Sequence, residues 1–349
     1  MIEKKEVKKL LEQIRQIKKS YQFYDCHVHP FDIILKRSDY HPLLDDNTIY
    51  CEDQSPYKPP QLEPVQLEND ALESKICQPD FVKKLILMQC KKLYKHIGPG
   101  VMKAHADFSA IDESLLLQVA QKEGDLEKEM RLVAQLFGKT DGFRISGSLP
   151  NSVKNEEVAT YIEKMVNQYK IKAFKLHPII TGIDISKSSG KERIENVLIS
   201  CSDSNLPLVI HGGTSYLYKN QPEETYTVIE NLEKINWSMS NSFVIIAHAA
   251  AYDCELDRIE KIILPKLNKM MDIHGNLLID ISGIGYKTLC AVLKHIDIER
   301  IIFGSDSLYS TQWVTMVRLF HALHNFPNST NNFLKIISLN PQKTIFNET

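Results

Sequence analysis

Leu206-Pro207-Leu208-Val209-Ile210-His211 is a short apolar run that ends in a histidine, and this pattern recurs along the chain. A brief run of branched aliphatic residues is typical of a buried parallel strand. Helical periodicity fills the segments between such runs, for example at 156–169, 191–204 and 286–295. The other runs lie at 84–89, 143–149, 171–177, 243–248, 276–281 and 300–306.

This alternation predicts an α/β fold of the (β/α)8 class, the TIM barrel. The later strands end about 26 to 37 residues apart, which is the length of one strand–helix–strand unit. A further strand at residues 24–29 brings the number of predicted strands to eight, and ligands are then expected at the C-terminal strand ends. An open doubly wound sheet is the competing architecture, but the early strands are not followed by a Gly-rich nucleotide-binding turn.

The segments around the barrel differ in character. Residues 1–20 are rich in Lys and Glu and carry a narrow apolar stripe, which predicts an N-terminal amphipathic helix. We assign residues 21–349 to a single barrel domain. Within it, residues 31–80 are proline-rich and lack a clear period. We interpret them as an insertion after the first strand that forms a lid or subdomain over the site.

Composition excludes several classes of function. The chain has 349 residues, of which 43% are hydrophobic and 25% charged, as in ordinary soluble proteins. Its net charge of −2 predicts neither a nucleic-acid partner nor a membrane surface. The seven cysteines are scattered and form no C-x-x-C pair, which favours a reducing compartment. We find no signal-peptide pattern and expect a cytoplasmic protein.

His27 and His29 suggest metal chemistry. They lie in Asp25-Cys26-His27-Val28-His29-Pro30, and residues two apart on a strand face the same side. Two neutral imidazoles can hold a divalent metal if other segments supply further ligands. By the same alternation Cys26 should point away from the histidines, so we interpret it as a packing residue.

Titratable residues also end the later strands. Lys175 and His177 share a face of one strand, whereas His211, His248 and Asp306 each close another. Any one of them alone is more often a satisfied polar residue at a strand end. Burying the whole set would be costly without a metal or mutual pairing, and we therefore predict a metal site. Asp280 is a candidate for a supporting hydrogen bond, and Arg144 for a carboxylate clamp or a contact with the helix layer.

Taken together, these motifs resemble the amidohydrolase superfamily, in the amidohydrolase-related branch that contains hydrolases and non-oxidative decarboxylases. The matching motifs are DCHVHP, FKLHP, LVIHGG, VIIAHAA and IIFGSDSLY. The resemblance implies that His27, His29, His211 and Asp306 are the metal ligands. It also implies that His248 lies beside the metal-bound water as an orienting group, acid or base, and that Asp306 shuttles a proton.

Lys175 has three interpretations, the simplest of which is a lysine paired with a carboxylate of the barrel. In dinuclear members of the family a lysine at this position is carbamylated and bridges two metals, and His211 and His248 would then hold the second ion. Alternatively, Lys175 and His177 bind an anionic group of the substrate, and we favour this arrangement with one ion. Nitrogen and carboxylate ligands suit Zn²⁺, and they are also compatible with Mn²⁺ and Fe²⁺.

We therefore predict a metal-dependent hydrolase that uses activated water on an amide, ester or lactone-type bond of a small, carboxylate-bearing molecule. The alternative is a non-oxidative decarboxylase or hydratase, a lyase, on the same barrel. A third hypothesis is an inactive binding protein, but that would predict a damaged ligand set, and every expected position is filled. The resemblance also implies a homo-oligomer.

Overall fold

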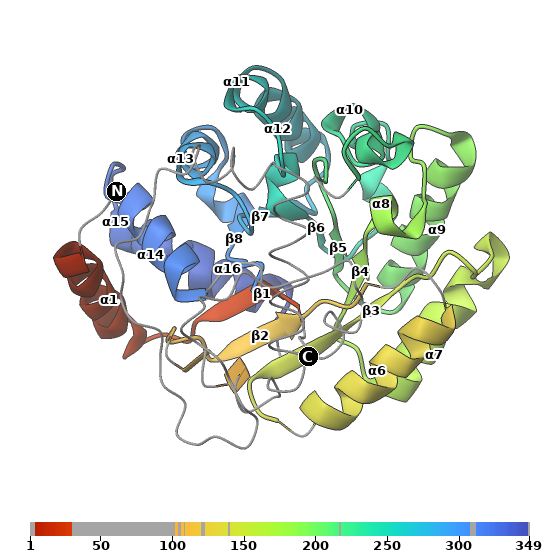
Figure 1. Cartoon of the computed structure of the whole chain (residues 1–349), viewed down its shortest axis with the longest axis horizontal. Helices are drawn as coiled ribbons and strands as arrows, with labels where there is room; N and C mark the ends of the chain where they lie inside the picture. The colour runs from red at the N-terminus through yellow and green to blue at the C-terminus, as the bar shows by residue number, and fades with distance from the viewer. Residues whose placement is uncertain are drawn as a thin grey trace.

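The computed structural model describes residues 4–29, 102–103, 106–107, 109–119, 123–138, 140–215, 218–307 and 312–347. In this part of the chain, eight parallel strands follow one another in sequence order around a barrel (Figure 1). They are β1 Tyr24–Val28, β2 Glu113–Leu116, β3 Phe143–Ser148, β4 Ala173–Leu176, β5 Leu208–Ile210, β6 Val244–Ile246, β7 Leu277–Asp280 and β8 Ile301–Ile302.

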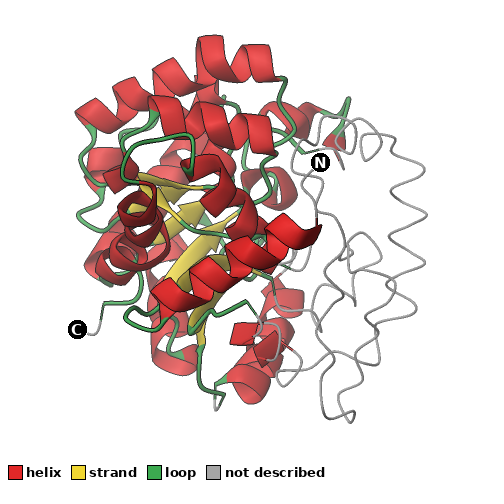
Figure 2. Cartoon of the chain, turned by 90° about the vertical axis from the view of Figure 1, so that its left-hand side faces the viewer, coloured by secondary structure: helices red, strands yellow, loops and turns green. Residues whose placement is uncertain are grey.

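Helices surround the strands on the outside of the barrel, as a side view shows (Figure 2). Parallel neighbours need a crossover connection, and the helices supply it while covering the outer face of the sheet. The longer helices are α1 Lys4–Lys18, α6 Glu123–Phe137, α7 Val158–Tyr169, α9 Ser188–Asp203, α12 Leu264–Ile273, α13 Tyr286–His295 and α14 Gln312–Leu323. Short helices are α8 Pro178–Thr181, α10 Ile229–Leu232, α11 Leu256–Arg258, α15 Ser329–Leu334 and α16 Asn340–Thr344.

The barrel closes where the chain that follows β8 returns to β1. The Asp306 N–H donates to the His27 carbonyl at 2.9 Å, and Val28 pairs with Ser307 in parallel register. Along β1 the pairing with β2 shifts between Asp25 and Val28, which is a β-bulge. The closure places His27 and Asp306 on neighbouring segments, so their side chains can share one site.

An apolar layer fills the barrel below that site. It contains Cys26 together with residues from other strands, among them Leu115, Ala173, Val209, Ile245, Leu278 and Ile302. Cys26 is a packing residue, as predicted, but the bulge lets it face the barrel interior as His27 does. Because side chains alternate along a strand, Lys175, His211 and Asp280 follow inward-facing residues by two positions and face inward as well.

The C-terminal segment closes the opposite end of the barrel. The Phe346 ring stacks on Tyr24 with centroids 4.6 Å apart. Arg144 donates to the carbonyls of Ile345 and Phe346 at 3.3 and 3.2 Å, and its Nε donates to Glu113 at 2.8 Å. Arg144 therefore neither clamps a ligand at the C-terminal strand ends nor faces the helix layer, because its guanidinium binds Glu113 and the segment that covers the N-terminal end.

The structure confirms the predicted barrel but corrects one strand. The predicted strands from residue 143 onward contain β3 to β8. The predicted strand at 84–89 and the insertion predicted at 31–80, with its lid role, lie outside the described residues. The second strand of the barrel is β2, at Glu113–Leu116, which the sequence pattern did not identify. The sequences at 84–89 and around Glu113–Leu116 are similarly apolar, so periodicity alone does not tell which of them is the strand that pairs with β1 and β3.

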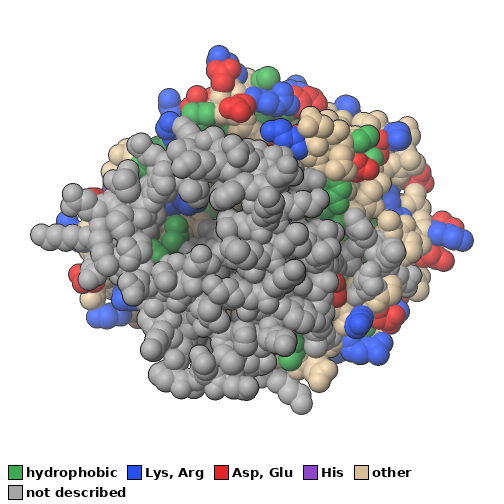
Figure 3. Space-filling view, in the orientation of Figure 1, with side chains coloured by type: hydrophobic (Ala, Val, Ile, Leu, Met, Phe, Trp, Pro, Cys, Tyr) green, Lys and Arg blue, Asp and Glu red, His purple; other side chains and the backbone are tan. Residues whose placement is uncertain are grey.

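The helix predicted within residues 1–20 is α1, and its apolar stripe is buried. Leu10, Leu11 and Ile14 belong to the main hydrophobic core, and α1 packs beside α14 (Figure 1). None of the described helices is long and apolar enough to cross a membrane. On the described surface visible in Figure 3, acidic and basic side chains are interspersed, in agreement with the net charge of −2.

Candidate metal centre

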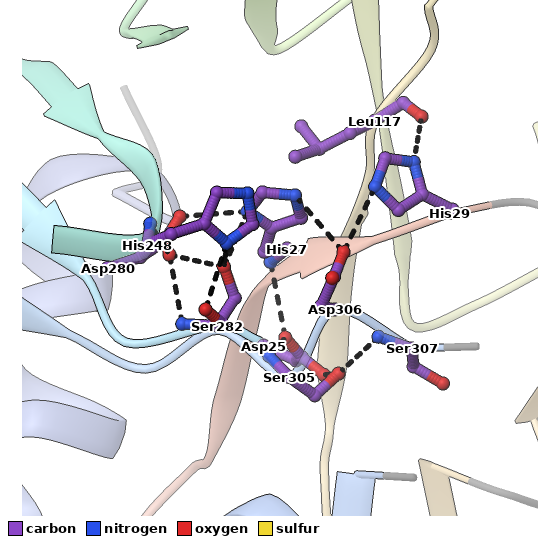
Figure 4. Close-up of polar contacts among 10 residues, drawn as sticks. All are labelled: Asp25, His27, His29, Leu117, His248, Asp280, Ser282, Ser305, Asp306 and Ser307. Atoms are coloured by element: carbon purple, nitrogen blue, oxygen red, sulfur yellow. Dashed lines mark hydrogen bonds and ion pairs between the residues drawn. The ribbon is translucent and has the colours of Figure 1, made fainter. Parts of the chain in front are cut away.

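His27, His29 and Asp306 converge at the C-terminal ends of β1 and β8 (Figure 4). The Asp306 Oδ1 atom lies 3.2 Å from His29 Nε2 and 3.6 Å from His27 Nε2. His27 is fully buried, and the side chains of His29 and Asp306 are 12% and 7% exposed. The three ligand atoms lie within 4.8 Å of one another, close enough to bind a single ion.

Hydrogen bonds at the far side of each ring determine which nitrogen carries the lone pair. His27 Nδ1 donates to Asp280 Oδ2 at 2.8 Å, and His29 Nδ1 donates to the Leu117 carbonyl at 3.2 Å. A carbonyl and a carboxylate oxygen only accept, so both Nδ1 atoms carry hydrogen and both Nε2 atoms are acceptors in the neutral rings. Three acceptors therefore face one another around Asp306, and a cation between them resolves the conflict.

Asp280 organises the second side of the site (Figure 4). Its Oδ1 accepts the backbone N–H of His248 at 2.9 Å, the backbone N–H of Ser282 at 3.0 Å and the Ser282 hydroxyl. Its Oδ2 accepts His27 Nδ1–H. A group of His27, His248 and Asp280 also has metal-binding geometry, but Asp280 is already saturated by donors. We therefore take it as the residue that orients His27.

His248 has its own orienting contacts. His248 Nδ1 lies 2.9 Å from both the carbonyl and the hydroxyl oxygen of Ser282. The carbonyl only accepts, so Nδ1 carries the hydrogen and Nε2 has the lone pair. The His248 ring is 4.9 Å from the His27 ring and 4.7 Å from the Tyr252 ring. His248 is thus a neutral base beside the three converging acceptors.

Burial and neighbouring charges set the ionisation of the site. Burial and the charge of Lys175 together lower the pKa of His27 to about 3, so the ring is in its neutral, metal-binding form. Burial would raise the pKa of Asp306, but the neighbouring imidazoles, His29 first among them, hold that pKa below its ordinary value. Burial also lowers the pKa of His248.

Strained backbone marks the same region. His248 has φ of 57° and Asp306 has φ of 60°, in the left-handed region that non-glycine residues rarely adopt. Gly283, with φ of 64°, lies against them, and a Cβ there would come within 3.1 Å of Asp306 Oδ2 and 3.4 Å of His248 Nδ1. Strain of this kind costs on the order of 1–3 kcal/mol per residue and persists where the surroundings enforce it.

The structure brings the other predicted site residues near the centre without joining them to the His27–His29–Asp306 group. The His211 ring stacks on His177 at 3.9 Å and meets the His248 ring edge-on at 5.0 Å. His211 Nε2 donates to the Thr214 carbonyl at 3.0 Å, so its lone pair is on Nδ1. Lys175 is fully buried, and its charge acts on both Asp280 and Asp306.

The residues present fit a divalent metal. Two neutral imidazole nitrogens and one carboxylate oxygen are ligands that Zn²⁺, Mn²⁺ and Fe²⁺ accept. The far nitrogens of both rings are held by a carboxylate and a carbonyl, which is the support that metal-binding histidines usually have. The ligand role predicted for His211 stays a prediction.

Comparison with known proteins places the chain in a family. A family model described as amidohydrolase matches residues 24–344. This chain belongs to the amidohydrolase family. The matched range runs from the first residue of β1 to the last residue of α16, so it contains the whole barrel. No curated protein matches the sequence closely enough to count as a relative.

Solved structures similar to this amidohydrolase include both decarboxylases and a hydrolase. The 5-carboxyvanillate decarboxylase from Novosphingobium aromaticivorans, solved with manganese and a nitrobenzoic acid ligand, has a TM-score of 0.58 at 14% identity, covering 93% of this chain and 96% of that one. The enzyme of the same name from Sphingomonas paucimobilis has 0.56 at 12%, covering 93% and 99%. A probable 2-pyrone-4,6-dicarboxylic acid hydrolase from Acinetobacter baumannii has 0.51 at 12%, covering 93% and 99%. These likenesses show the fold.

Sequence reasoning missed two residues that hold the site of this amidohydrolase together. Ser282 bridges His27, His248 and Asp280, and its only signal was its place two residues after a strand-ending aspartate. Asp25 accepts the Ser305 hydroxyl at 2.6 Å, Gln312 Nε2 at 2.9 Å and the His27 N–H at 3.2 Å. Burial raises the pKa of Asp25 to about 6 although all its partners are donors.

Proposed function

We propose that this chain is a metal-dependent hydrolase that acts on an amide, ester or lactone-type bond of a small, carboxylate-bearing molecule. The observation that carries the proposal is the convergence of three acceptor atoms, from His27, His29 and Asp306, around a point that needs a cation. We propose His27, His29, His211 and Asp306 as the metal ligands. His211 would bind the metal through Nδ1, because its Nε2–H is donated to the Thr214 carbonyl.

A bound divalent cation would supply Lewis acidity, which polarises a substrate oxygen and lowers the pKa of water. The protein supplies the proton transfers. His248 Nε2 is unprotonated and is placed to take a proton from attacking water and return it to the leaving group. Asp280 and Ser282 hold the backbone and Nδ1 of His248, so that the imidazole keeps this tautomer. Asp306 takes part as a second proton acceptor.

Lys175 and His177 support a carboxylate-bearing substrate. Lys175 lies on the inner face of β4, and His177 follows the strand as the N-cap of α8. His177 Nδ1 accepts the Ile180 N–H at 3.4 Å, which leaves Nε2–H as a donor. Burial lowers the pKa of Lys175 to about 8, although the charges of Asp280 and Asp306 oppose this change. We favour one ion with a free Lys175, and we regard carbamylation of Lys175 with a second ion as the alternative.

Non-oxidative decarboxylation is the second candidate, and a specific observation favours it. A buried lysine among the histidines suits a substrate whose carboxylate itself reacts. Several proteins of the same fold are decarboxylases of aromatic acids, one of them bound to 2,6-dihydroxybenzoate. We give this reaction the same site and the same ligands. The carbon that loses CO2 must gain a proton, which His248 Nε2 would first take from water and then deliver.

The two reactions differ in what they release. Purified protein loaded with Zn²⁺ or Mn²⁺ should be offered aromatic acids on the one hand and lactone, ester and amide derivatives of small dicarboxylates on the other. Acid release from the second set, followed with a pH indicator, supports the hydrolase, and CO2 release from the first set supports the decarboxylase. Protein that takes up no stoichiometric metal, judged against His27→Ala by elemental analysis, contradicts both.

His248→Asn provides a matched test of the base. Asn tolerates the left-handed backbone at this position, so the substitution removes the imidazole without adding strain. We expect turnover to fall by about 10²–10⁴-fold while metal content stays at the wild-type level. Turnover near that of the wild type would remove His248 from the proposed mechanism.

A further inference from the structure

One side of the site contains buried donors that have no acceptor. Lys175 is 0% exposed, and its Nζ makes no hydrogen bond to any residue that the structure describes. Ser148 is also 0% exposed, and its hydroxyl has no partner in the described part of the chain. Buried polar groups are nearly always hydrogen-bonded, so two orphans in one place require an explanation.

The two orphans are neighbours on the inner face of the barrel. Ser148 and Lys175 are direct partners in the register of β3 with β4, and directly paired residues of adjacent strands point to the same side. Lys175 faces inward because it follows the buried Ala173 by two residues. Its charge acts on His27, Asp280 and Asp306, which places the ammonium group within the site.

Gln118 is a third buried polar residue, and its backbone lies beside β3. Its N–H donates at 3.0 Å to the hydroxyl of Ser146, which lies two residues before Ser148 on the same face of β3. Gln118 is 1% exposed, and both atoms of its amide lack a partner among the described residues. Within the site itself, the β3–β4 side holds the unused donors Ser148 and Lys175, whereas the β7–β8 side holds two carboxylates.

A buried ammonium group without an acceptor is expensive. Each unpaired buried cation costs several kcal/mol even after relaxation, and the fold retains it only if something offsets the cost. The acceptor that fits two neighbouring donors, one of them charged, is a carboxylate, which accepts on both oxygens. Such a ligand would neutralise Lys175 and satisfy Ser148 together.

We propose that Ser148 and Lys175 form a subsite for a carboxylate of the substrate, opposite His248 and Asp306. This deepens the proposed function, because it states where the non-reacting carboxylate of a hydrolase substrate lies. Such a subsite favours organic acids in which the distance between the carboxylate and the reacting bond matches the distance from Lys175 to the candidate metal centre. A neutral amide of the same shape lacks the negative charge and the second acceptor oxygen that the subsite requires.

Benzoate and its neutral analogue benzamide are suitable probes. Their binding to the full-length protein should be measured by calorimetry, once with chelator and once with Mn²⁺. We expect benzoate to bind at least tenfold more tightly than benzamide in both states. We expect Lys175→Met to weaken benzoate about tenfold or more, and Ser148→Ala about threefold to tenfold. Ser109→Ala, another buried serine without a described partner, is the control and should bind benzoate as the wild type does.

Lys175→Met has a second readout that a purely structural lysine would not give. Met fills similar space without a charge, so the ligand-free variant should melt at or above the wild-type temperature while losing benzoate binding. Unchanged benzoate affinity in Lys175→Met overturns the subsite. A ¹³C NMR signal of a carbamate, seen after incubation with ¹³C-bicarbonate and absent from Lys175→Met, also overturns it. A carbamylated lysine is an anion and would repel a carboxylate.

The outcomes separate this inference from the proposed function. If benzoate binding depends on Lys175 and Ser148 while the protein takes up no metal, the subsite stands and the metal-dependent reaction falls. If the protein binds metal stoichiometrically and benzoate affinity ignores both substitutions, the subsite falls and the proposed function stands.

Discussion

At the residue scale, Asp280 decides which nitrogen of His27 faces the proposed metal. Asp280→Asn replaces an ionised acceptor by an amide that receives the same backbone donors poorly and no longer fixes the His27 tautomer. We expect metal affinity to fall about 10–100-fold, the usual effect of removing a partner of a metal-binding histidine. Competition against a chromophoric chelator measures this directly. Asp297→Asn, at an exposed carboxylate that caps a short helix, should leave the affinity unchanged.

Gly283 offers a second test at this scale, with an internal control. Gly283→Ala places a methyl group about 3 Å from Tyr252 and Asp306 in a backbone conformation that costs alanine roughly 1–2 kcal/mol. Gly182 has a similar φ of 70° but no atom within 4 Å of an added Cβ. Gly182→Ala should therefore lose stability alone, whereas Gly283→Ala should lose both stability and metal affinity. Equal metal affinity in the two variants would contradict the placement of Gly283.

At the element scale, the sequence pattern predicted β1 and β3 to β8 but not β2. The ends of β4, β5 and β6 are easy to predict because a histidine follows each strand and ends its apolar run. β2 has no such residue at its end, and the sequence pattern predicts a strand at 84–89 in its place. The tautomers of His27 and His29 were also beyond reach, since they depend on Asp280 and Leu117, which are distant in sequence.

The C-terminal segment is an element whose role can be tested apart from the site. Phe346 is 2% exposed and packs on Tyr24, with Arg144 5.0 Å from its ring centroid. Phe346→Ala should lower the free energy of unfolding by about 3–5 kcal/mol, the usual cost of removing a buried phenylalanine. Chemical denaturation measures the change. Metal affinity of the folded variant should equal the wild-type value, because this segment closes the other end of the barrel.

At the scale of the whole molecule, the barrel was predictable because its strand–helix period repeats, whereas the site was predictable only in part. Alternation places His27, His29 and Asp306 on one rim, and the structure brings them together. Alternation cannot anticipate the bulge in β1 or the left-handed backbone at His248, because both depend on how neighbouring segments pack. The reaction itself follows from the loops and the substrate, since one barrel supports many chemistries.

Metal removal should then affect the stability of the entire barrel. The three acceptors come from the two segments that close the ring, so an ion bound between them stabilises the folded state alone. A ligand that binds only the folded state adds about 2.7 kcal/mol at a free concentration of 100 times its Kd. The melting temperature should therefore rise steadily with added Zn²⁺ or Mn²⁺ and fall on addition of chelator. His27→Ala should show a flat response, and a wild-type melting temperature that ignores metal would contradict the site.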